Sequence, residues 1–336
     1  MKIKKNNISV CFSYPVFAFL RKGLNPQEEL SKGSDESLGK ARRILIRYIF
    51  KLGREGRSSF YGIIQQTPSE KAKHLREFFT DGRNMVTGTI EELLSDFDHF
   101  VDYFYENCPF SFKQYYFHKK VIEKIRREEY RHLITDKNFL KDVYRVVLEW
   151  MGERGKGKLV AFDSFLDKIG SVGESQRELQ ELLEKLSDLR LHELDGEKWE
   201  KWKSSVEKLF KKVWDLKLRE GSESQIVTAS KTLHHLLPDL IPPIDRMYTL
   251  KFFSLHYISN YRIPPRILED KNPERIREYR RDRETKQFAE VLGTFHDISR
   301  KLGLTEKNLK REWDTSIPKL IDNAIIGYVL RTTRKI

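Results

Sequence analysis

The stretch Ile226–Tyr248 reads IVTASKTLHHLLPDLIPPIDRMY, and the fold can be argued most directly from it. Its first half predicts a helix, because apolar residues recur at helical spacing after small polar residues. Pro238 ends that helix, since proline has no backbone N–H and its ring clashes with the preceding turn. Pro242 and Pro243 then fix an extended connection. Asp245 stands where the next helix should begin, and its carboxylate can accept hydrogen bonds from the free N–H groups there.

The composition favours an anionic partner. The chain has 336 residues, of which 34% are charged and 12% aromatic, and its formal net charge is +13. The aromatic content is enough for a substantial core, which excludes wholesale disorder. A positive excess of this size favours nucleic acid, because binding to phosphates releases their counterions.

The hydrophobic pattern predicts a predominantly all-α, multi-helical fold. Apolar residues follow helical spacing in the ranges 179–189 and 199–214, and a further apolar helix is expected near the C-terminus. Residues 8–20 are the best candidate for a short β segment near the N-terminus. The glycine- and lysine-rich segment 152–158 is the best candidate linker, so we expect an N-terminal domain of residues 1–151 and a C-terminal domain of residues 152–336.

The stretch quoted above resembles a segment of the helix-hairpin-helix DNA glycosylases. In that family a glycine-rich hairpin leads into a helix that begins Lys-Thr-Ala in the bifunctional members. A proline-containing connection and an aspartate at the start of the next helix follow. With Asp245 on the family aspartate, Val227, Thr228 and Ala229 fall on the Lys-Thr-Ala positions without a gap. The segment is also similar to an uncharacterised family that shares the pattern VTASK-L…P-LIP-x-D.

The resemblance implies a C-terminal glycosylase-like domain and a role for two residues in base excision. Asp245 would stabilise the developing oxocarbenium ion or activate the attacking nucleophile. Val227 replaces the family lysine, so Lys231, one turn further along the helix, is the candidate for a Schiff base. The resemblance makes DNA the favoured partner over RNA. The expected nucleic-acid contacts are Ser224, Gln225, Thr228, His234, Arg246, Arg277, Arg280 and Arg281.

Two other functions remain open. The family hairpin is rich in glycine, whereas here Ser222–Gln225 follow a single Gly221, which favours a non-catalytic nucleic-acid-binding or scaffold protein. The residues Arg127 and His132 form an R-x4-H pattern. This pattern is similar to the motif of the HEPN ribonucleases, which cleave RNA with an arginine and a histidine on one helix.

Several kinds of site and location are not indicated. Two cysteines, Cys11 and Cys108, cannot form a disulfide framework or a cysteine-rich zinc site. No metal-ligand or cofactor motif stands out, and we expect neither. The apolar run at residues 12–20 is interrupted by Pro15 and is too short to span a membrane. We therefore expect a cytoplasmic protein, and the sequence leaves its oligomeric state open.

Overall fold

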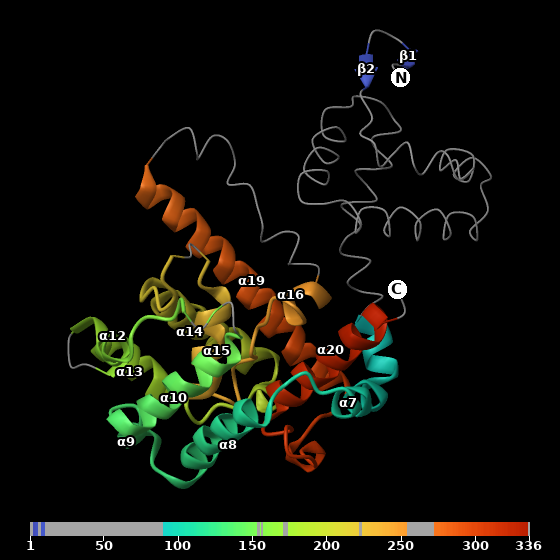
Figure 1. The fold of residues 1–336 in the computed structure, drawn as a ribbon. Helices are drawn as coiled ribbons and strands as arrows, with labels where there is room; N and C mark the ends of the chain where they lie inside the picture. Colours follow the sequence, from blue (N-terminus) through green and yellow to red (C-terminus); the bar gives the residue numbers. More distant parts are fainter. Residues whose placement is uncertain are drawn as a thin grey trace. The chain divides into compact units, whose positions relative to one another are not determined.

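The computed structural model describes residues 3–5, 8–10, 90–152, 155, 157–170, 174–221, 224–253 and 272–334. The chain divides into two compact units, Met1–Gly82 and Arg83–Ile336. The first contains a short antiparallel pair, β1 (Ile3–Lys5) and β2 (Ile8–Val10), in which Ile3 lies opposite Val10. The second is helical, so the expectation of a predominantly all-α fold is confirmed (Figure 1).

The structure describes a series of helices in the second unit, named in chain order. They are α7 (Phe97–Glu106), α8 (Phe112–Arg127), α9 (Tyr130–Leu133), α10 (Lys137–Trp150), α12 (Phe162–Gly170), α13 (Glu174–Leu186), η1 (Leu191–Glu193), α14 (Gly196–Asp215), α15 (Ile226–Leu236), α16 (Thr249–Phe252), α19 (Pro273–Lys301), η2 (Glu306–Asn308) and α20 (Ile317–Arg334). None of the described helices combines the length and apolar character needed to cross a membrane.

Helix α15 is the centre of this unit. All of its residues are buried, and it contacts α8, α10, α14 and α19 (Figure 1). It begins at Ile226 and ends just before Pro238, as the proline requires. Because the helix is enclosed, its polar residues must find partners inside the protein. Lys231, His234 and His235 of α15 therefore bond to groups inside the protein.

Helices α7 and α20 pack closely against each other, and a glycine allows the approach. A Cβ atom placed on Gly327 of α20 would lie only 1.9 Å from the carbonyl oxygen of Phe100 in α7. Glycine is the one residue that leaves this space to the facing backbone. The contact fixes the C-terminal helix against the start of the second unit.

The segment expected to be a linker at residues 152–158 lies inside the second unit. The N–H of Val160 donates to the Leu218 carbonyl at 3.0 Å, and the N–H of Glu220 donates to the Lys158 carbonyl at 2.6 Å. Helix α10, before this segment, packs on α12 and α15, after it. Lys158, at the end of the segment, and Val160, just after it, therefore hold the loop between α14 and α15.

Candidate nucleic-acid interface

The structure brings together the two residues for which a catalytic role was expected. The Lys231 Nζ donates to Asp245 Oδ2 at 2.8 Å and to the Trp150 carbonyl at 2.5 Å. Lys231 reaches this position from the buried helix α15, and its side chain is only 5% exposed. The side chain of Asp245 is 30% exposed. Of this ion pair, the carboxylate is the member that solvent or a ligand can reach.

The proline-containing connection positions Asp245 through backbone contacts. Pro242 and Pro243 are buried, and the next N–H, of Ile244, donates to Ser230 Oγ at 3.2 Å. The Asp245 N–H donates to Thr249 Oγ1 at 3.1 Å. The connection is thus tied to α15 on one side and to α16 on the other.

The surroundings of Asp245 favour its charged form. Burial opposes ionisation, but the charge and hydrogen bond of Lys231, together with the N–H groups of Met247 and Tyr248, outweigh it and hold the pKa of Asp245 below its usual value. The Met247 N–H donates to Asp245 Oδ1 at 2.6 Å. Helix α16 itself begins only at Thr249, and its N-cap is Tyr248 without a side-chain cap, so Asp245 binds the turn before the helix and does not cap the helix as the sequence predicted. The site therefore presents a fixed negative charge.

A second ion pair, which the sequence analysis did not identify, lies behind the first. The Lys319 Nζ donates to Asp322 Oδ2 at 2.7 Å and to Asn323 Oδ1 at 2.6 Å, and all three residues are buried. The Thr249 hydroxyl lies 3.4 Å from Asp322 Oδ1 and so connects the two pairs. Burial raises the pKa of Asp322 despite the charge of Lys319. The sequence pattern could have indicated this pair, because a lysine and an aspartate stand within the otherwise apolar run IPKLIDNAII.

The ammonium group of Lys319 is enclosed by aromatic rings. Its Nζ lies between 5.3 and 5.6 Å from the centroids of Phe104, Phe110, Trp150 and Trp313. Such contacts partly compensate a buried cation for lost hydration. The rings and the two hydrogen bonds together explain how this lysine is accommodated in the core.

Three buried histidines lie beside these ion pairs, and two of them are linked by a hydrogen bond. The His235 Nδ1–H donates to the Lys231 carbonyl at 2.7 Å, so its Nε2 is free to accept from His118 Nδ1–H at 3.1 Å. His118 Nε2 then accepts from Thr315 Oγ1 at 2.7 Å. His234 is also fully buried, with Nδ1 2.7 Å from the Ile241 carbonyl. The contact with nucleic acid expected for His234 is therefore not available in this structure.

An internal carboxyl group occupies the start of α15, beside Ser224 and Gln225, for which a nucleic-acid contact was expected. Glu284 Oε2 accepts from the N–H groups of Gln225 and Ile226, each at 2.9 Å, and from Trp214 Nε1 at 2.6 Å. A helix start attracts negative charge, and here Glu284 of α19 supplies it. The N–H groups that would contact a phosphate are already hydrogen-bonded.

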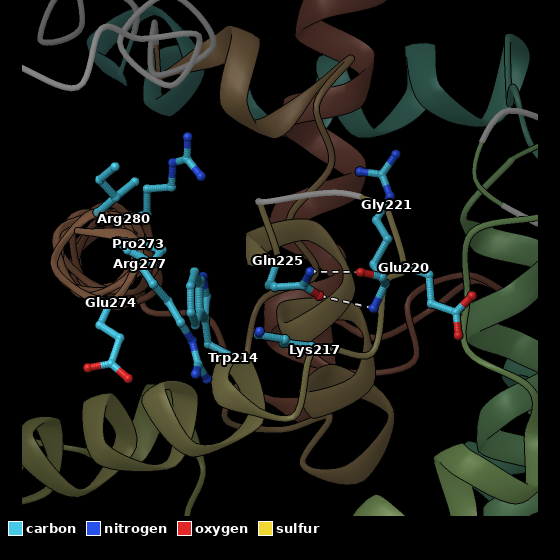
Figure 2. Close-up of a pocket in the computed structure, with 11 residues that line it drawn as sticks. Trp214, Lys217, Glu220, Gly221, Gln225, Pro273, Glu274, Arg277 and Arg280 are labelled. Atoms are coloured by element: carbon cyan, nitrogen blue, oxygen red, sulfur yellow. Dashed lines mark hydrogen bonds between the residues drawn. The ribbon is translucent and has the colours of Figure 1, made fainter. Parts of the chain in front are cut away.

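Three more residues were expected to contact nucleic acid. Gln225 and Thr228 bond inside the protein, and Ser224 is half-buried. The Gln225 side chain holds the backbone of Arg219 with bonds of 3.0 and 2.9 Å (Figure 2). The Thr228 hydroxyl is buried, 3.5 Å from Met151 Sδ. Ser224 is half-buried at the end of the same loop. Gln225 and Thr228 stabilise the loop and the core, and neither offers a surface contact to DNA.

An open groove of about 710 Å³ lies between this loop and the beginning of α19. Figure 2 shows Arg277 and Arg280 of α19 on one side and Lys217 and Glu220 of the loop on the other. The cations that line it are Lys217, Arg219, Arg277 and Arg280, and the carboxylates are Glu220 and Glu274. Four cations against two carboxylates make the groove basic.

The remaining expected arginines differ in their surroundings. Arg277 and Arg281 both pair with Asp215, at 2.8 and 3.1 Å, and Arg281 is half-buried outside the groove lining. Arg246, next to Asp245, is exposed. Burial and the positive charge of Arg246 lower the pKa of Arg219.

The R-x4-H pattern does not lie on one helix. Helix α8 ends at Arg127, Glu128 and Glu129 adopt extended backbone, and His132 belongs to the short helix α9. Arg127 lies 4.0 Å from Glu123, and His132 lies 3.3 Å from Glu129. The single-helix geometry on which the ribonuclease resemblance depends is absent from this part of the described chain.

Neither a metal site among the described residues nor the comparisons with known proteins gave a further assignment. Among the described residues, no group of three His, Cys, Asp or Glu side chains is arranged to hold a metal ion. Comparisons of the chain with protein-family models, with curated proteins and with solved structures found no match.

Proposed function

We propose that the protein binds nucleic acid, with DNA as the favoured partner, through the groove between the α14–α15 loop and α19. The observation that carries this proposal is the gathering of Lys217, Arg219, Arg277 and Arg280 around one open groove. Arginine and lysine at such a surface neutralise phosphates and release counterions. The formal net charge of +13 supports the same partner.

The groove replaces the hairpin contact that the family resemblance implied. The backbone N–H groups at the start of α15 bind Glu284, so the phosphate contacts fall to side chains of the same loop and of α19. Arg246, next to Asp245 in the sequence, is exposed and adds a further positive charge.

Binding of a labelled DNA duplex, followed by fluorescence anisotropy, tests the proposal. The variant Lys217→Glu/Arg280→Glu should bind at least tenfold more weakly than the unmodified protein at about 0.1 M salt, because two phosphate contacts become repulsive. The matched control is Lys137→Glu/Lys141→Glu, which reverses two exposed charges on α10, outside the groove lining. Equal affinities of the two variants would contradict a specific role for the groove.

A second candidate function is base excision without strand cleavage, and Asp245 carries it. Its carboxylate is held in the charged form and is partly exposed, which suits stabilisation of an oxocarbenium ion. Lys231 is buried and bound to Asp245, so a sugar could reach its amine only if this ion pair opened. We therefore propose no lyase step for Lys231 and assign it the positioning of Asp245.

Base release from a panel of duplexes with modified bases tests this second candidate. Release by the unmodified protein that is abolished in Asp245→Asn, with no adduct trapped by borohydride, is the expected result. If duplexes are bound and every base is retained, the non-catalytic binding protein is the correct alternative. A trapped adduct that depends on Lys231 would contradict the positioning role.

A further inference from the structure

Two exposed aromatic rings lie side by side on α8, away from the groove. Among the described residues, the large hydrophobic side chains exposed to solvent are Phe112 at 80%, Tyr116 at 51% and Met247 at 67%. Phe112 and Tyr116 are four residues apart on one helix face, with ring centroids separated by 6.5 Å. Burial in the core, which is the usual fate of such residues, does not explain this pair.

The helix that carries the rings is held firmly at this end. Ser111 and Gln114 form a capping box, which satisfies backbone donors at the helix start. The Gln114 side chain donates to the Glu149 carbonyl at 3.0 Å, and Trp150 Nε1 donates to the Gln114 carbonyl at 3.3 Å. The first turn of α8 is thus tied to the end of α10. The rings are presented from a fixed backbone.

Positive charge continues along α8 from the rings. Lys119 and Arg127 share Glu123, at 3.8 and 4.0 Å, and Lys120 and Lys124 share the buried Asp142, at 2.8 and 3.1 Å. Four cations therefore meet two carboxylates, and the surface keeps a net positive charge. An apolar protein partner would have to desolvate these charges, whereas a polyanion would pair with them.

We propose that Phe112 and Tyr116 form a stacking platform for the unpaired bases of single-stranded nucleic acid. Every base has a π-face, so aromatic side chains stack on bases without sequence preference. The neighbouring cations Lys119 and Lys120 would hold the backbone that links the stacked bases. The proposal rests on the proposed nucleic-acid binding and adds a second, strand-specific contact, since no residue of α8 lines the groove.

The test compares a single-stranded pyrimidine oligonucleotide of about 15 nucleotides, a length within the range of known single-strand sites, with a blunt duplex. Phe112→Ala/Tyr116→Ala should weaken single-strand binding tenfold or more, because stacking on the two rings is lost. Duplex binding should stay unchanged, since paired bases do not present their faces. The variant Phe112→Tyr/Tyr116→Phe keeps both rings and should bind the single strand like the unmodified protein.

Three outcomes separate this inference from the proposed function. If the alanine variant binds the single strand normally while Lys217→Glu/Arg280→Glu loses duplex binding, the platform is wrong and the groove stands. If the alanine variant loses single-strand and duplex binding equally, the rings do not select unpaired bases, and the platform is again contradicted. If the unmodified protein binds neither oligonucleotide, the proposed function fails and the platform with it.

Discussion

The buried amine of Lys231 donates hydrogen bonds to Trp150 and to Asp245, which belong to two other parts of the chain. Its Nζ joins the end of α10, through the Trp150 carbonyl, to the start of the α16 segment, through Asp245. A buried ion pair is costly to form but costlier to break, because the remaining charge loses its partner. Lys231 therefore contributes mainly by fixing the position and charge of Asp245.

Lys231→Met is expected to lower the free energy of unfolding by about 3 kcal/mol, the lower end for a broken buried pair, since Asp245 is partly exposed. The pKa of Asp245 should rise in this variant. Urea unfolding measures the first effect and NMR titration of the carboxyl group the second. Asp245→Asn in the same chain removes the unpaired charge and should restore part of the stability. A loss that is unchanged in the double variant would contradict the account.

The buried histidines predict a loss of stability in mild acid. Burial, and then the charges of neighbouring groups, lower the pKa of His118 and His234 well below the usual value and the pKa of His235 to about 3. As the pH falls below about 6.5, the unfolded chain takes up protons that the folded chain does not. Stability should therefore decrease by up to about 1.4 kcal/mol per pH unit for each histidine.

Urea unfolding at pH 7 and pH 5 measures this decrease. The buried carboxyl groups with a raised pKa act in the opposite direction; they are Asp239, Asp314 and Asp322. His132 is exposed, so His132→Gln is the matched control variant. His118→Gln should make the decrease shallower. A decrease of the same size in both variants would show that other groups cause it.

At the scale of the element, the start of α15 depends on Glu284. Replacing Glu284 by alanine would leave three buried donors without an acceptor, at a cost of about 1–3 kcal/mol each before relaxation. Glu284→Ala should also gain more stability from sulfate than the unmodified protein does, since the vacated helix start can accept an anion. Thermal unfolding with and without sulfate measures both effects. Equal stability of the variant and the unmodified protein would contradict the role of Glu284.

The close packing of α7 against α20 predicts that a larger residue at Gly327 lowers the stability of the protein. Gly327→Ala should destabilise by about 3 kcal/mol or more, because the new Cβ overlaps the Phe100 carbonyl and the helices must separate. Gly293 in α19 is the matched control, since a Cβ there meets nothing closer than 3.9 Å. Gly293→Ala should stabilise by about 0.5–1 kcal/mol through helix propensity. Comparable losses in both variants would argue against the close crossing.

The helices could be predicted from the sequence more readily than their partners. The spacing of Trp199, Val206 and Trp214 indicates the buried face of α14, and Pro238 marks the end of α15. Local patterns do not reveal tertiary partners. The glycines of 152–158 indicated a linker, but their neighbours pair with the loop at 218–220.

The candidate site shows the same division between local pattern and tertiary partner. The sequence singled out Lys231 and Asp245, and the structure joins them in one ion pair. It did not reveal that Glu284, 59 residues after Gln225, would occupy the start of α15. Nor did it show that Arg277 and Arg281 would share Asp215. These contacts depend on how α14, α15 and α19 pack.

At the scale of the whole molecule, the central claim is that the positive charge of the groove, more than net charge, binds nucleic acid. The observed binding constant for a duplex falls with salt with a slope of about −0.9 for each phosphate neutralised. The most direct measurement is therefore duplex affinity across a series of salt concentrations. Lys217→Glu/Arg280→Glu and Lys137→Glu/Lys141→Glu lower the net charge equally, so they separate the two effects.

The groove variant is expected to reduce the steepness of the salt dependence by about 1.8, for two lost phosphate contacts, while the α10 variant keeps the slope of the unmodified protein. The same slope for all three proteins, or the same reduction in both variants, would contradict the groove as the site of binding.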